Sequence, residues 1–168
     1  MVKTSSEHGP DCTCGCHDHN HEHAHDHDHG HDHDHDHGRH HDHAAEREVE
    51  CGWGTAVLES HVHDQAATVS ATIYAQSGSA ATFEVLVEAL KSVAQHVESA
   101  GGIVGHIKAY ARAGDSFVHA SATDAQHEPS CEGDASLLLG PEVYCQLVAI
   151  ALLIDLEQLE QIVVGALN

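Results

Sequence analysis

The chain has 168 residues and a formal net charge of −21, from 27 acidic and six basic side chains. Its length allows one domain plus a tail. Residues 1–50 carry 13 acidic and three basic side chains (−10), and residues 51–168 carry 14 and three (−11). This balance excludes a basic nucleic-acid-binding surface and disfavours an anionic membrane, so cations are the natural partners.

The first residues, Met1-Val-Lys-Thr-Ser-Ser-Glu-His, lack the apolar stretch of a secretory signal peptide, so we expect a cytoplasmic protein. Thiols stay reduced in that compartment, which makes the six cysteines candidates for metal ligation or burial rather than for disulfides. The longest apolar run, 147–154, is far below the roughly 20 residues of a membrane helix, so no membrane insertion is expected.

Residues 8–43 hold fifteen of the 21 histidines, alternating largely with aspartate after a cysteine cluster. Apart from cysteine, no hydrophobic residue larger than alanine occurs there, so residues 1–50 are expected to form a disordered metal-binding tail and linker. Imidazole, thiolate and carboxylate are ligands of divalent transition metals, with Ni(II) or Zn(II) expected first and Co(II) third. The predicted ligands are Cys12, Cys14, Cys16, His17, His19, His21, His23, His25, His27, His29, His31, His33, His35, His37, His40, His41 and His43.

The repeat predicts high capacity, modest affinity and fast exchange, because a flexible chain offers many ligand sets of similar energy. The three cysteines, with His17 or the α-amino group, can supply four donors and should form a tighter site. Their short spacing suits a distorted or square-planar chelate of Ni(II) or Cu at least as well as a tetrahedral zinc site. A purification tag or inert solubilising segment is the alternative, but a tag would not carry this cysteine motif.

Thr13-Cys14-Gly15-Cys16 followed by a histidine-rich run resembles the N-terminal arm of the hydrogenase-maturation nickel GTPases. In that family a CxxCGC cluster precedes histidine repeats and holds nickel for delivery, whereas here Cys12-Thr13-Cys14 is CxC. The resemblance covers residues 12–43 and implies a nickel role. The GxxxxGK[ST] phosphate loop occurs nowhere in the chain, so the resemblance does not extend to GTP hydrolysis.

Residues 51–168, after a polar linker at 44–50, predict an α+β domain: a mainly antiparallel sheet with two helices packed on one face. Two hairpins are expected to bury one face each. In the first, that face carries Ala56, Leu58, Val62, Ala67, Val69, Ala71 and Ile73; in the second, Ile107, Ala109, Ala111, Val118, Ala120 and Ala122. The expected elements are strands at 55–63, 66–76, 103–113, 116–123 and 143–154, a loop at 124–134, and helices at 82–100 and from 155 onward.

The run 143–154 could also be a helix; a strand is favoured because Asp155 to Gln158 then reads as a helix start. Cys145 in this run is expected to be a packed small hydrophobe.

His61 and His63 are the metal-ligand candidates of the domain, since alternate residues of one strand share a face. Glu59 lies on that face, and His119 or the loop pair His127 and Cys131 could complete a site. Two ordinary solvated histidines are the alternative.

His106 and His119 share a face of the second hairpin, but the assumed register separates them by four strand residues, about 13 Å. They therefore cannot share one ion. Between them lie Lys108, Tyr110 and Arg112, whose side chains could form a partner-docking or anion-binding surface.

We expect a metal-handling protein that stores, buffers or delivers Ni(II), Zn(II) or Co(II). Its domain would dock on a recipient metalloenzyme, a metal transporter or a second copy of the chain. The first alternative is a metalloenzyme whose ion is held by His61 and His63 and supplied by the tail. The second is a metal-responsive interaction module. No catalytic residues are assigned, because the chain carries no nucleophile elbow, phosphate loop or HExxH motif.

Overall fold

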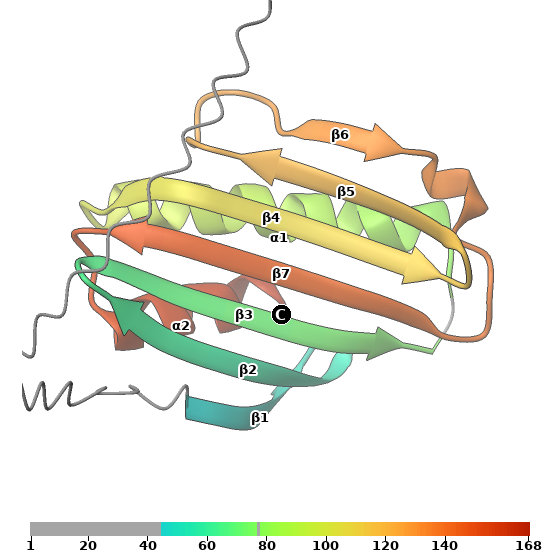
Figure 1. The fold of residues 1–168 in the computed structure, drawn as a ribbon, viewed down its shortest axis with the longest axis horizontal. Coiled ribbons are helices and arrows are strands. Elements are labelled where there is room, and N and C mark those ends of the chain that lie inside the picture. The colour runs from blue at the N-terminus through green and yellow to red at the C-terminus, as the bar shows by residue number, and fades with distance from the viewer. Residues whose placement is uncertain (1–44, 77) are drawn as a thin grey trace, which may run out of the picture. The chain divides into compact units, whose positions relative to one another are not determined.

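The computed structural model describes residues 45–76 and 78–168, which form an antiparallel sheet of seven strands with two helices on one face. Figure 1 shows both helices behind the sheet, so no helix of the described residues covers the opposite face, which we call the open face. The elements are β1 (Ala45–Cys51), β2 (Gly54–His63), β3 (Ala66–Ala75), α1 (Ala80–Ser99), β4 (Ile103–Ala113), β5 (Ser116–Ala122), β6 (Ser130–Gly133), the 3-10 turn η1 (Ala135–Leu137), β7 (Val143–Leu152) and α2 (Leu156–Ala166).

The strand order is β1-β2-β3-β7-β4-β5-β6, with every neighbouring pair antiparallel. The α+β class and the placement of both helices on one face are therefore confirmed. The last strand, β7, inserts between the two hairpins and pairs with β3 on one side and β4 on the other. β7 thus joins the two hairpins, each made of strands that are adjacent in the sequence, into one continuous sheet.

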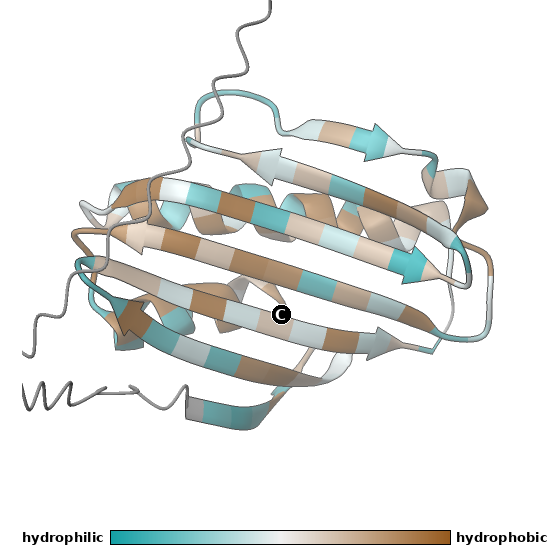
Figure 2. Ribbon diagram, in the orientation of Figure 1, coloured by the Kyte–Doolittle hydropathy of each residue, from teal (hydrophilic) through white to brown (hydrophobic). Residues whose placement is uncertain are grey.

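The buried face follows from alternation along the strands, which Figure 2 shows as changing hydropathy from one residue to the next. Leu58, Val69, Ile107 and Leu147 are at most 1 % exposed and pack beneath the helices. Each such aliphatic side chain contributes about 1.5–3 kcal/mol by burial. Small residues on β4 and β5 leave room for the apolar side of α1; among the buried ones are Ala109, Ala111 and Ala120.

Local capping groups mark the ends of the helices, and α1 begins at Ala80, two residues before the expected start at 82. Ser79 is the N-cap of α1, and Gly101 follows it with φ +84°, donating its N–H to the Glu98 carbonyl. Asp155 caps α2 by accepting the Gln158 N–H at 2.8 Å. Residues 143–152 form a strand rather than a helix, and Cys145 on it is buried, so both expectations for this run are confirmed.

The linker expected at 44–50 is wrong from Ala45 onward, because 45–51 form the edge strand β1, paired with β2 from Ala45–Ser60 to Cys51–Gly54. Alternation puts its glutamates on the open side and Val49 and Cys51 against the core. Charged residues are common on edge strands, where they oppose pairing with another chain, so charge alone was a poor sign of a linker.

Two smaller expectations were also wrong. The loop expected at 124–134 contains β6, a four-residue strand paired with β5, which is too short to show a pattern in the sequence. Val62 shares a face with the buried Ala67, as expected, but its expected burial is wrong: it is 43 % exposed, while Ser60 on the same face is only 2 % exposed.

Neither helix of the described part has the length and apolarity of a membrane span.

Candidate functional site

The predicted tail ligands, from Cys12 to His43, lie outside the residues that the structure describes. Among the predicted metal ligands, the structure therefore places only His61 and His63. Both lie at the end of β2, beyond the point where β1 begins opposite Ser60. They share the open face, as the alternation predicted.

His61 and His63 have no third ligand within the described part of the chain. The side chain of His63 is 82 % exposed, and its Nδ1 lies 3.2 Å from the Asp64 carboxylate. His119 on β5 is four strand positions from β2, roughly 19 Å at the usual strand spacing. No group of three or more histidine, cysteine, aspartate or glutamate side chains that could hold a metal occurs in residues 45–76 and 78–168.

The remaining histidine and cysteine candidates are also separate. His127 binds the Asp124 carboxylate at 2.9 Å within its loop, and this hydrogen bond, with two backbone N–H donors, lowers the pKa of Asp124. Cys131 is exposed on β6, whereas burial raises the pKa of the Cys145 thiol to about 11. Neither cysteine is a member of a ligand cluster among the described residues.

The open face carries an aromatic row that runs across four strands. We define it as Tyr74 on β3, Tyr144 on β7, Tyr110 on β4 and Phe117 on β5. Successive ring centroids are 5.7, 6.2 and 6.2 Å apart, within the range of favourable aromatic pairs. All three tyrosines and one of the two phenylalanines of the chain belong to it, and Tyr74 and Phe117 are more than half exposed.

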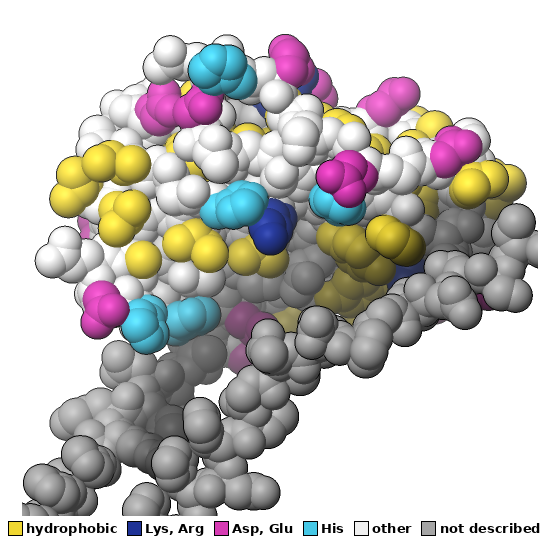
Figure 3. Space-filling view, turned by 45° about the horizontal axis from the view of Figure 1, so that its top comes forward, with side chains coloured by type: hydrophobic (Ala, Val, Ile, Leu, Met, Phe, Trp, Pro, Cys, Tyr) yellow, Lys and Arg dark blue, Asp and Glu magenta, His cyan; other side chains and the backbone are white. Residues whose placement is uncertain are grey.

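Positively charged side chains flank this aromatic row on β4. Lys108 and Arg112 alternate with Tyr110 on the open face, both are exposed, and neither forms an ion pair with another described residue. Lys108 and Tyr110 line a hollow of about 540 Å³, together with His106, His119, Tyr144 and Gln146. Figure 3 shows histidine, basic and hydrophobic side chains next to one another on one side of the domain.

The register confirms the expected separation of His106 and His119. His119 pairs with Tyr110, and His106 lies four residues away from that tyrosine along β4. His119 instead faces Glu132 on β6, with 3.6 Å between Nε2 and the carboxylate. The hollow therefore presents cationic and aromatic groups for binding and no assembled pair of metal ligands.

The aromatic row was the feature that sequence reasoning missed. Tyr110 and Phe117 were visible on one face of a hairpin, but Tyr74 and Tyr144 join them only through the pairing of β7 with β3 and β4. The available signal was the position of the few aromatic residues, which lie on the polar face of each expected strand.

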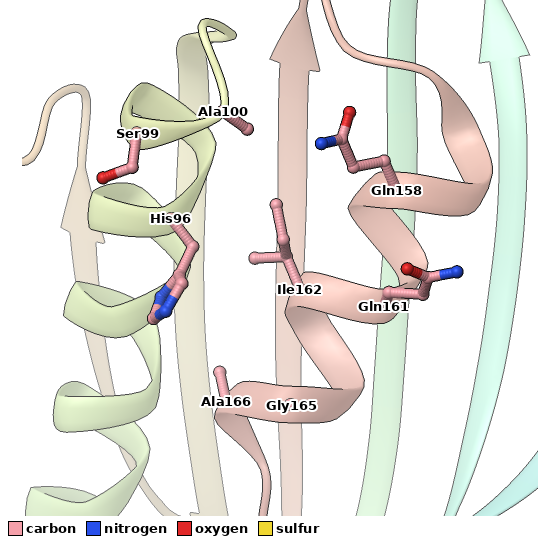
Figure 4. A pocket seen from close by; sticks show the side chains of 8 residues that line it. All are labelled: His96, Ser99, Ala100, Gln158, Gln161, Ile162, Gly165 and Ala166. Atoms are coloured by element: carbon pink, nitrogen blue, oxygen red, sulfur yellow. The ribbon is translucent and has the colours of Figure 1, made fainter.

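A second hollow, of about 480 Å³, lies between the end of α1 and α2 (Figure 4). Ile162 on α2 points toward α1, and Ser99 and Ala100 line the opposite wall. His96 is its only titratable side chain, and its Nδ1 lies 2.7 Å from the Ser92 carbonyl. The Ser92 hydroxyl lies 3.3 Å from His96 Nδ1, but no carboxylate of the described residues lines the groove, so it has no evident catalytic chemistry.

Comparison with protein-family models gives no match. The search of curated proteins likewise finds no similar chain. No solved structure matches it either.

Proposed function

We propose that this protein binds, stores or delivers divalent transition-metal ions, Ni(II) or Zn(II) first and Co(II) third, with residues 8–43 as the capture segment. The observation that carries the proposal is ligand density: fifteen histidines and three cysteines lie within that segment. Neutral imidazole and thiolate are the donors that these ions prefer. The described part of the domain offers no competing cluster of three ligands.

Nickel is the favoured cargo, because the arm at 12–43 resembles that of the hydrogenase-maturation nickel proteins. Delivery requires a recipient, for which a metalloenzyme or a metal transporter is the natural class. Since thiolates are the active ligands of the cysteine trio, the protein is proposed to work where thiols stay reduced, as in the cytoplasm.

A metal-responsive interaction module is the second candidate, and the open face favours it. The aromatic row and the two cations, Lys108 and Arg112, which have no ion-pair partner in residues 45–76 and 78–168, offer a surface that a passive solubility domain does not need. The metalloenzyme alternative has less support, because His61 and His63 lack a third ligand among the described residues.

Metal titration of protein purified without an affinity tag tests the proposal. Calorimetry and elemental analysis should find several Ni(II) or Zn(II) ions per full-length chain. A variant lacking residues 1–43 should still fold, because its buried core lies within 56–167 and remains complete. It should lose nearly all of this capacity, because the proposed ligands of the capture segment are gone.

A matched variant, His61→Gln with His63→Gln in the full-length chain, should keep the capacity unchanged. If the shortened protein instead retained about one tightly held ion per chain, and the same two substitutions abolished the binding of that ion, the strand histidines would be the metal site. A full-length chain that binds no ion at micromolar metal and neutral pH would refute the proposed function.

A further inference from the structure

We propose that the hollow of about 540 Å³ on the open face, formed by β4, β5 and β7, binds a small organic monoanion: a carboxylate carried by a planar aromatic ring. The site lies wholly within the residues that the structure describes, and the proposal does not depend on the metal binding proposed above. It stands on an unpaired cation, a lining without acidic groups and a pair of aromatic walls.

The hollow is assembled by the register of three strands. Lys108 on β4 pairs with Ser121 on β5 and with Val148 on β7, and all three line it. Side chains that are directly opposed in this way have Cβ atoms about 4.5–5.5 Å apart. Tyr110 lies two residues further along β4, and its own partners on β5 and β7 also line the hollow: His119 and Gln146. The pairing therefore gathers these side chains around one volume, which is within the usual range of small-molecule sites.

The cation of the hollow has no partner in the domain. Residues 45–168 contain four basic side chains, and two of them, Arg47 and Lys91, form ion pairs with glutamates. The ammonium of Lys108 is exposed and forms no ion pair or hydrogen bond with another residue of 45–76 and 78–168. Its three N–H donors are therefore available to a ligand.

Neutral donors surround this ammonium. Within the described residues, the imidazole of His106 and the hydroxyls of Tyr110 and Tyr144 form no hydrogen bond. The hydroxyl of Ser121 lies 3.1 Å from that of Ser130 on β6, which leaves it able to bind a second partner. A carboxylate accepts hydrogen bonds from ammonium and hydroxyl groups alike, so the hollow can satisfy both of its oxygens.

The described lining of the hollow contains no aspartate or glutamate, although the chain has a net charge of −21. The carboxylate of Glu132 on β6 is 3.6 Å from the Nε2 of His119, so its charge is directed at that imidazole. Glu142 lines a separate hollow together with Arg112. Lys108 is therefore the full charge that a ligand in this hollow would meet, and it selects an anion.

The charge of the site favours a carboxylate over a phosphate. One ammonium among neutral donors balances a single negative charge, whereas a phosphate monoester carries about −1.5 to −2 at pH 7. Phosphates are commonly held by the bidentate fork of arginine, and Arg112 does not line this hollow. The acidic chain as a whole adds a repulsion that grows with the charge of the ligand.

The rest of the lining suits a flat ring. The ring centroids of Tyr110 and Tyr144 are 6.2 Å apart, with an interplanar angle of 67°. Because the two rings are steeply inclined, a flat ligand ring can pack on the face of one and against the edge of the other, and both arrangements are favourable. Val148 adds apolar surface directly opposite Lys108. One hollow thus offers contacts for both the ring and the charge of a single molecule.

NMR titration of the full-length, metal-free protein with naphthalene-2-carboxylate tests the proposal. We expect saturable shifts of the backbone amides of the residues that line the hollow on β4, β5 and β7, with a dissociation constant on the order of 1 mM. The groove between α1 and α2, which Ile162 lines, is the internal comparison and should show no such shifts. Saturable shifts confined to that groove or to residues 1–44 would overturn the site.

Three related probes separate the charge from the ring. Naphthalene-2-carboxamide has the ring without the charge, and decahydronaphthalene-2-carboxylate has the charge without the flat ring; each should bind at least about threefold more weakly. 2-Naphthyl phosphate should bind no more tightly than the carboxylate. Equal binding of the amide or of the saturated acid would contradict the proposed class of ligand, and so would tighter binding of the phosphate.

Lys108→Gln should weaken the binding of naphthalene-2-carboxylate at least about threefold, because a charge contact is lost at an exposed position. Lys91→Gln is the matched control: it removes a lysine from α1, on the helical side of the sheet, and should leave the affinity unchanged. Affinity that Lys108→Gln leaves intact would overturn the site, as would the lack of any saturable shift up to about 10 mM probe.

Discussion

Glu160 of α2 accepts a hydrogen bond from the Arg47 guanidinium of β1, with 2.7 Å between Oε2 and Nη2, although 113 residues separate the two in the sequence. The other oxygen of Glu160 accepts a hydrogen bond from the hydroxyl of Ser60 on β2. One carboxylate thus ties the last helix to the first two strands. It also holds β1, the strand from which the tail departs, against the domain.

Replacement of Glu160 by alanine should lower the free energy of unfolding by about 1–3 kcal/mol, mainly because the buried Ser60 hydroxyl loses its partner. Ser60 is 2 % exposed, so water cannot readily replace the carboxylate. The share from Arg47 is small, since its side chain is 49 % exposed. Urea unfolding measures the change, and Glu84→Ala on the exposed side of α1 should shift it by less than about 0.5 kcal/mol.

The same carboxylate should make stability depend on pH. Burial opposes its ionisation, but the hydrogen bonds from Ser60 and Arg47 outweigh burial and lower the pKa of Glu160. Below the ordinary glutamate pKa of about 4.3, the unfolded chain takes up a proton before the folded one does. The contribution is therefore complete above that pH and is lost as pH falls through the lowered value.

Urea unfolding of the wild type and of Glu160→Gln from neutral pH to about pH 3 measures this loss. The stability difference between them should shrink on acidification. The pKa values of Asp124 and Asp134 are also lowered by local hydrogen bonds, but these groups titrate in both proteins and cancel. A difference that stays constant with pH would show that Glu160 keeps an ordinary pKa.

The central strand β7 offers a matched test of the two faces of the sheet. Leu147 is fully buried beneath the helices, whereas Ile150, three residues on, lies on the open face and is 37 % exposed. Leu147→Ala should cost about 2–5 kcal/mol through the cavity that it leaves. Ile150→Ala should cost no more than about 1 kcal/mol, mostly from strand propensity. Equal losses would mean that the open face is covered as completely as the core.

Local pattern predicted most of the fold. Alternation in 55–63, 66–76 and 103–123 gave both hairpins and their registers, since a two-residue turn fixes which residues pair. The insertion of β7 between β3 and β4 was beyond such reasoning, because no local feature records which strands a distant strand will join. The charged edge strand β1 and the four-residue β6 were missed for want of an apolar pattern.

The candidate surface depended on that same long-range pairing. Lys108, Tyr110 and Arg112 could be recognised as one polar face from their alternation in a single strand. The contacts of Tyr144 with both Tyr74 and Tyr110 required the register of β7 on both sides. The ligands from Cys12 to His43 stay a prediction, which rests on residue chemistry alone.

Thiol reactivity should separate the cysteines into classes. Cys131 is exposed and should react rapidly with a disulfide reagent at pH 8, whereas Cys145 should react only on unfolding, because it is buried and its thiol pKa is raised to about 11. Cys131→Ser and Cys145→Ser assign the two signals. Prior addition of one equivalent of Ni(II) should slow three further thiols, those of Cys12, Cys14 and Cys16, if the cysteine trio is the tighter site.

Metal capacity should fall steeply between about pH 7 and pH 5, since an imidazole must lose its proton before it can bind a metal and its ordinary pKa is about 6.5. Calorimetric titration with Ni(II) across this range measures the fall. Substitution of the aspartates of the repeat by asparagine separates the two kinds of donor: histidine-based binding keeps most of its capacity at pH 7 in that variant. Capacity that survives at pH 5 in the wild type and disappears in the asparagine variant would show that carboxylates are the main ligands.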